Sequence, residues 1–263
     1  MTTKSSPSKF QFISNPFTSS FEGMSKLFKH NQTPALVILV LSFFGAIFNL
    51  FSSLPFPSDS STTNGTVENE VAAPIVAFAV TAGIILMIIS IVVGVLYAGV
   101  VNYVTWKTSR GESADLGEAL RETMKRFWRI LAIQIIVGLK VFIGIIFFIV
   151  PGIRAALRYQ MVLIAMFDED LGIQQSMDRV KKLTHQNLME VFGIMTVSQL
   201  LFPVAILIQM GGESVLYPQL KQLKDNNLPK PETHWLNYLG FIIFAGFFFL
   251  FAMTMLLVLA AVN

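Results

Sequence analysis

The longest apolar run of the sequence limits the fold more than any other feature. Residues 72–106 form a stretch of about 35 residues without a single Asp, Glu, Lys or Arg. Roughly 20 mostly apolar helical residues are enough to cross the hydrocarbon core of a bilayer. Only 13% of the chain is charged and 54% is hydrophobic, so a soluble fold would lack the polar residues to cover its core. The sequence therefore indicates an integral membrane protein.

Further apolar runs predict an all-α, polytopic membrane helical bundle with six transmembrane helices. The expected spans are residues 35–56, 72–106, 127–150, 152–167, 188–210 and 236–262. The fourth run is short, so a four-span bundle stays open if the third and fourth runs form a re-entrant hairpin. The expected organisation is a cytoplasmic N-terminal segment, 1–34, with a short amphipathic helix, followed by a single transmembrane domain, 35–263.

The basic residues predict the orientation of the bundle. The segments before the first run, after the second and after the fourth hold four, six and three of the 19 lysines and arginines. The loop 57–71 holds none and the loop 211–235 holds three, so both are expected to be external. Because basic loops stay in the cytoplasm, we expect a multi-pass protein of the cell membrane, of the bacterial cytoplasmic type, with both termini cytoplasmic. We expect no cleavable signal peptide; the first span would serve as the insertion signal.

Three polar segments precede the first, third and fifth runs, and they share a plan. Residues 20–29, 115–128 and 173–183 carry apolar residues at helical spacing, with basic residues on the other face. This pattern is typical of amphipathic helices lying at an anionic cytoplasmic interface. The alternatives are a charged extension of the next span and a helix docked on the bundle. The chain would then contain three repeated units, each an interfacial helix followed by a transmembrane hairpin.

The middle of the chain carries a recognisable series of short motifs. They are Leu116-Gly117-Glu118-Ala119-Leu120, Phe127-Trp128-Arg129-Ile130, Ile149-Val150-Pro151-Gly152-Ile153 and Phe167-Asp168-Glu169-Asp170. Over residues 116–197 the chain resembles a poorly characterised family of bacterial membrane proteins grouped with the membrane domain of glycerophosphoryl diester phosphodiesterases. The resemblance implies a multi-helix protein of the cytoplasmic membrane. It implies no enzymatic activity, because the phosphodiesterase activity belongs to a separate catalytic domain that this sequence lacks.

Three basic residues inside the apolar runs are the candidate site. Lys140 lies near the middle of the third run, where a charge costs roughly 3 kcal/mol on insertion scales. Arg154 and Arg158 are four residues apart and therefore share a helix face, which suits a phosphate. We expect a break at Pro151-Gly152 to form a hairpin in which the three cations bind an anionic group or lipid headgroup. The alternatives are a Lys140 paired with helix carbonyls or Glu190, and arginines that merely anchor at lipid phosphates.

Other signals of chemistry are absent from the sequence. There is no cysteine, the three histidines lie far apart, and no catalytic set or phosphate loop is visible. We therefore expect a non-enzymatic protein without cofactor or metal that binds or organises lipid or a membrane protein partner. The expected partners are membrane lipids with anionic headgroups, another membrane protein or a second copy of the chain, and not nucleic acid. The alternative function is a transporter or channel for a small anionic solute.

Overall fold

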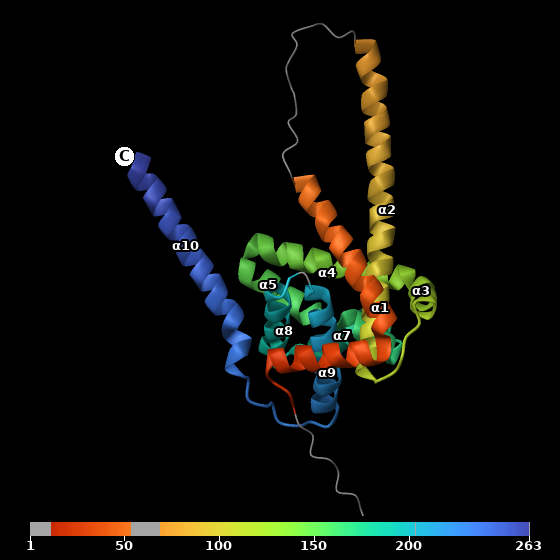
Figure 1. Ribbon diagram of the computed structural model, residues 1–263, viewed down its shortest axis with the longest axis vertical. Helices are drawn as coiled ribbons and strands as arrows, with labels where there is room; N and C mark the ends of the chain where they lie inside the picture. The colour runs from red at the N-terminus through yellow and green to blue at the C-terminus, as the bar shows by residue number, and fades with distance from the viewer. Residues whose placement is uncertain (1–11, 54–68, 203, 263) are drawn as a thin grey trace, which may run out of the picture.

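The computed structural model describes residues 12–53, 69–202 and 204–262, and its regular structure in these ranges is entirely helical, as predicted (Figure 1). The elements are α1 (Pro16–Ser53), α2 (Asn69–Ser109), α3 (Leu116–Lys125), α4 (Phe127–Phe147), α5 (Ile149–Tyr159), α6 (Val162–Glu169), α7 (Ile173–Thr184), α8 (Leu188–Leu200), α9 (Ala205–Asp225), the 3-10 helix η1 (Trp235–Tyr238) and α10 (Leu239–Val262). The expected external loop 57–71 lies outside the described residues except for its last three, which begin α2.

Within the part of the chain that the structure describes, four helical stretches are long and apolar enough to cross a membrane. They are Pro16–Ile47, Val80–Ser109, Phe127–Phe147 and Ile149–Glu169, the last of which comprises α5 and α6. The prediction of a membrane protein is therefore supported, and these four stretches contain most of the first four expected spans. The six-span count and the three repeated units stay predictions.

The fifth expected span, 188–210, does not form a single helix. Helix α8 ends at Leu200, and a separate helix, α9, starts at Ala205. The 13 residues of α8 extend only about 20 Å, too short for a hydrocarbon core of about 30 Å. The expected external loop 211–235 is also wrong for its first half, because α9 continues to Asp225 and is buried from Met210 to Tyr217. Hydropathy fails here because α9 is covered by protein, which tolerates polar residues that lipid would not.

Helix α1 is bent where a side chain holds it to the end of α2. Asn31 has φ −136° and ψ 43°, and its Nδ2 donates at 3.0 Å to both Thr108 Oγ1 and the Glu112 carbonyl. Its Oδ1 accepts from the backbone N–H of Ala114. The first part of α1 therefore lies across the base of the bundle, and the second part rises beside α2 (Figure 1).

The predicted amphipathic segments form α3, α7 and the first part of α1. The apolar residues Met177, Val180 and Leu183 of α7 are buried in the protein, so α7 is docked on the bundle, the alternative left open above. On α3, Leu120 and Met124 are exposed. The position of α3 and of the first part of α1 at the membrane interface stays a prediction.

A glycine pair allows the first part of α1 to cross α9 at backbone contact. A Cβ added to Gly23 would lie under 2.5 Å from the Gly211 carbonyl, and one added to Gly211 would lie 2.5 Å from the Met24 backbone nitrogen. We expect Gly23→Ala to lower the free energy of unfolding by about 2 kcal/mol, because backbone atoms cannot make room as side chains do. Thermal unfolding in detergent measures this. Gly83→Ala is the matched control, since nothing lies within 4 Å of its added Cβ; equal loss in both variants would contradict the close crossing.

A partly buried polar cluster ties the end of α6 to α2 and α9. Asp168 accepts hydrogen bonds from Trp106 Nε1 at 3.1 Å and from Tyr217 OH at 2.9 Å, and it forms an ion pair with Lys221. The neighbouring Glu169 pairs with Lys221 and with Arg179. Asp168 and Glu169, which belong to the motif Phe167-Asp168-Glu169-Asp170, therefore hold helices together in this fold.

Candidate functional site

The α4–α5 hairpin ends in a continuous apolar tip. Residues 145–150 are all bulky and apolar, and each is 50–75% exposed. Phe148 has extended backbone angles, φ −162° and ψ 142°, and links the two helices. Such a patch on a helical hairpin marks a surface that contacts lipid or another protein.

The turn of this hairpin lies three residues earlier than predicted. The break is at Phe148 rather than at Pro151-Gly152, because Pro151 occupies the first turn of α5, where its missing N–H costs no helical hydrogen bond. Gly152 instead lets the two helices approach, since an added Cβ would lie 2.8 Å from the Ile145 nitrogen. The expected antiparallel hairpin is present.

The structure brings the three predicted cations to one cavity. Lys140 on α4 and Arg154 and Arg158 on α5 line a space of about 400 Å³, together with Pro151, Ala155 and Tyr159. Lys140 thus faces the same side as both arginines, a rotation that sequence alone could not fix.

Lys140 is held by an aromatic residue that the sequence analysis did not single out. Its Nζ lies 3.4 Å from Tyr159 OH and 4.9 Å from the centre of the Tyr159 ring. A cation over an aromatic face is attracted to it. Glu190, the acid suggested as an alternative partner, instead accepts from Thr233 Oγ1 at 2.8 Å. The one available signal was the position of Tyr159 directly after Arg158.

The two arginines complete a cationic cavity without a carboxylate. Arg154 is exposed, and Arg158 is partly buried with an Nε that has no hydrogen-bond partner. Among the described residues, no acid forms an ion pair with Lys140, Arg154 or Arg158. Cations that converge without an acid repel one another unless an anion or water compensates. The geometry therefore suits an anionic group.

Glu213 lies buried in α9, although the sequence pattern predicted an external loop over residues 211–235. It is 6% exposed, and its Oε1 accepts from Gln160 Nε2 at 2.8 Å and from Gln209 Nε2 at 2.9 Å. Burial raises the pKa of Glu213 to about 7, although the two amide hydrogen bonds oppose the shift. Its partners lie on α5–α6 and α9, so only the tertiary fold reveals the site.

A larger cavity of about 880 Å³ lies between the rising part of α1 and α2, next to α9. Its lining is mainly apolar, with residues such as Leu41, Val93 and Ile206, and it does not include the three cations. This cavity is therefore separate from the one that Lys140 lines.

Within the described ranges, no three His, Cys, Asp or Glu side chains are grouped so as to hold a metal ion. Comparison with protein-family models, with curated proteins and with solved structures found no match to this chain. The family suggested by the motifs therefore stays a prediction.

Proposed function

We propose that this chain is a non-enzymatic membrane protein that binds an anionic lipid headgroup at the α4–α5 hairpin. The observation that carries the proposal is the cavity lined by Lys140, Arg154 and Arg158, which lacks an acid and lies beside an exposed apolar tip. Arginine binds phosphate oxygens through two parallel N–H bonds, and lysine adds a point charge. A lipid phosphate satisfies all three cations while the acyl chains surround the tip.

The dimensions of the hairpin favour insertion into one leaflet. Lys140 lies eight residues before Phe148 and Arg154 lies six after it, which places them about 12 Å and 9 Å from the turn at 1.5 Å per residue. One leaflet contributes about 15 Å of hydrocarbon. Inserted tip first, the hairpin therefore brings its cations near the headgroups, whereas a full span would leave Lys140 in mid-bilayer. In Figure 1, α4 runs across the direction of α2 rather than alongside it, which argues against α4 as a full span parallel to α2.

A re-entrant hairpin changes the inferred topology. With α8 and α9 in the protein core, the crossing helices are α1, α2 and α10. The uncharged α10 follows Trp235 and Tyr238, which suit a membrane interface. Arg154, Arg158 and the basic residues of α9 then join the other cations in the cytoplasm, in agreement with the positive-inside rule.

An odd number of crossings places the C-terminus outside, whereas the prediction of two cytoplasmic termini requires an even number. A phosphatase reporter fused at Asn263 is expected to be active, and a fluorescent reporter at the same position to be dark. The reverse pattern would restore an even number of crossings and contradict the re-entrant arrangement.

Lipid binding tests the proposed function itself. We expect phosphatidylglycerol, and not phosphatidylcholine, to bind the protein in neutral detergent. Neutralising each cation as Lys140→Gln, Arg154→Gln or Arg158→Gln is expected to weaken binding roughly tenfold, the value of a hydrogen bond to a charged group. Lys29→Gln is the matched control, because Lys29 is exposed and lies outside the cavity. Parent-like affinity in all three variants would exclude the hairpin as the lipid site.

The alternative function, transport of a small anionic solute, shares this cationic cavity. It predicts uptake into proteoliposomes that depends on the same three residues. The family resemblance is likewise retained as a proposal, since the hairpin and the acidic cluster fall within residues 116–197.

A further inference from the structure

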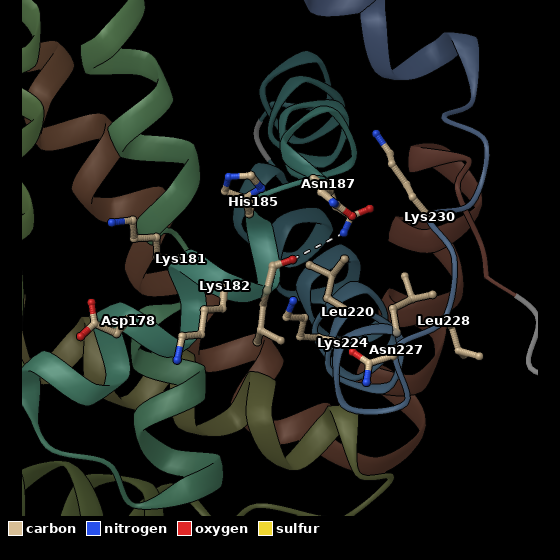
Figure 2. A pocket seen from close by; sticks show the side chains of 13 residues that line it. Asp178, Lys181, Lys182, His185, Asn187, Leu220, Lys224, Asn227, Leu228 and Lys230 are labelled. Carbon is tan, nitrogen blue, oxygen red and sulfur yellow. Dashed lines mark hydrogen bonds between the residues drawn. The ribbon is translucent and has the colours of Figure 1, made fainter.

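A second basic pocket lies between α7 and the end of α9, away from the hairpin tip. It measures about 560 Å³ and is lined by Lys181 and Lys182 from one side and by Lys224 and Lys230 from the other (Figure 2). Its lining includes one acid, Asp178, whose carboxylate accepts from Gln174 Nε2 at 3.2 Å. The pocket lining therefore carries four lysines and one acid, an excess of positive charge.

The protein neutralises most of its other cations with acids. Ion pairs of 4.0 Å or less hold Lys26, Lys107, Arg110, Lys125, Arg126, Arg129, Arg179 and Lys221. Among the described lysines and arginines without an acidic partner, all but Lys29 and Arg121 line either the hairpin cavity or this pocket. The unpaired charge is thus concentrated at two cavities rather than spread over the surface.

A buried amide in the pocket wall provides an independent observation. Asn187, at the start of α8, is only 7% exposed, and its Nδ2 donates to the Leu183 carbonyl at 3.5 Å. Its Oδ1 is buried and has no hydrogen-bond partner in the described structure. A buried acceptor without a donor is unfavourable, so a ligand that brings a hydroxyl or N–H would stabilise this wall once the side chain adjusts.

We propose that the α7–α9 pocket is a second binding site, which takes a phosphate group that carries a neighbouring hydroxyl. The lysines match the phosphate as point charges, and Asn187 Oδ1 matches the hydroxyl. Both a free phosphorylated polyol and a glycerophosphate lipid headgroup have this chemistry. The inference does not depend on the hairpin as a lipid site, because none of the lining residues is shared.

The test measures binding of glycerol phosphate, inorganic phosphate and phosphatidylglycerol nanodiscs to the full chain by calorimetry. The background carries Arg154→Gln, so that binding at the hairpin is weakened. We expect glycerol phosphate or the nanodisc lipid to bind, and Lys182→Gln with Lys224→Gln to weaken that binding roughly a hundredfold, about tenfold for each charge. Lys182→Arg with Lys224→Arg keeps the charge and is expected to restore most of it.

The results distinguish a free solute from a lipid headgroup as the ligand, or they exclude the site. Binding of soluble glycerol phosphate more tightly than inorganic phosphate supports a free solute, and binding of nanodisc lipid alone supports a headgroup. Lys29→Gln with Arg121→Gln removes the same charge outside both cavities and is expected to change nothing. The proposal would be overturned if this control lost as much binding affinity as the Lys182→Gln, Lys224→Gln variant. It would also be overturned if the background protein bound none of the probes. Circular dichroism and thermal unfolding confirm that each variant is folded.

Discussion

Replacement of Asp168 by Ala is expected to lower the free energy of unfolding by about 2 to 3 kcal/mol, the value of hydrogen bonds to a charged group. The ion pair of Asp168 with Lys221 is only partly buried, so the loss is smaller than for a fully buried pair. Here the loss also strands the indole N–H of Trp106 and the hydroxyl of Tyr217. Lys221 keeps its contact with Glu169, so the lower end of the range applies if its ammonium moves to that carboxylate.

Thermal or denaturant unfolding in detergent measures the effect of Asp168→Ala. The matched control is Asp178→Ala, because Asp178 is exposed and, among the described residues, accepts hydrogen bonds only from Gln174. We expect the control to change stability by no more than about 0.5 kcal/mol. Similar stabilities for the two variants would mean that the acidic cluster does not tie α6 to α2 and α9.

The second large effect is a pH dependence that Glu213→Gln removes. The pKa of Glu213 is raised to about 7 in the folded chain, from 4.5 for an exposed glutamate. Between these values the folded state holds more protons than the unfolded state, so stability falls as pH rises. A shift of this size corresponds to about 3 kcal/mol, which is lost by the time pH exceeds 7.

The variant Glu213→Gln keeps an acceptor for Gln160 and Gln209 but cannot ionise. We therefore expect it to equal the parent near pH 4.5 and to exceed it by about 3 kcal/mol at pH 8. Subtracting the free energy of unfolding of one protein from that of the other at each pH removes the contribution of all other titrating groups. A pH-independent difference would show that Glu213 is not buried as described.

The sequence patterns predicted those features that depend on neighbouring residues alone, namely apolar helices and residues that share a helix face. The uncharged run 72–106 lies within α2, and the four-residue spacing of Arg154 and Arg158 placed them on one helix face. The burial of α9 was not predictable, because Glu213 and Lys221 resemble loop residues unless their partners on other helices are known. Those partners, Gln160 and Asp168, lie more than 50 positions earlier in the chain.

The hairpin turn shows the same limit on a smaller scale. Pro151-Gly152 is a strong signal for a break, yet a proline in the first turn of a helix is tolerated, and the chain turns at Phe148 instead. The choice depends on the contact of Gly144 and Ile145 with Gly152 across the hairpin, which no single-residue preference encodes.

The proposed arrangement places the tip of the hairpin inside one leaflet. The chain has no cysteine, so a single Phe148→Cys substitution provides a unique label site without other changes. In intact cells and in inverted vesicles, we expect this cysteine to resist a membrane-impermeant maleimide from both sides. Ser58→Cys, in the expected external loop, and Arg121→Cys, in the expected cytoplasmic segment, report access from each side. Labelling of Phe148→Cys from the outside as fast as Ser58→Cys would show that the hairpin crosses the membrane and would contradict the account.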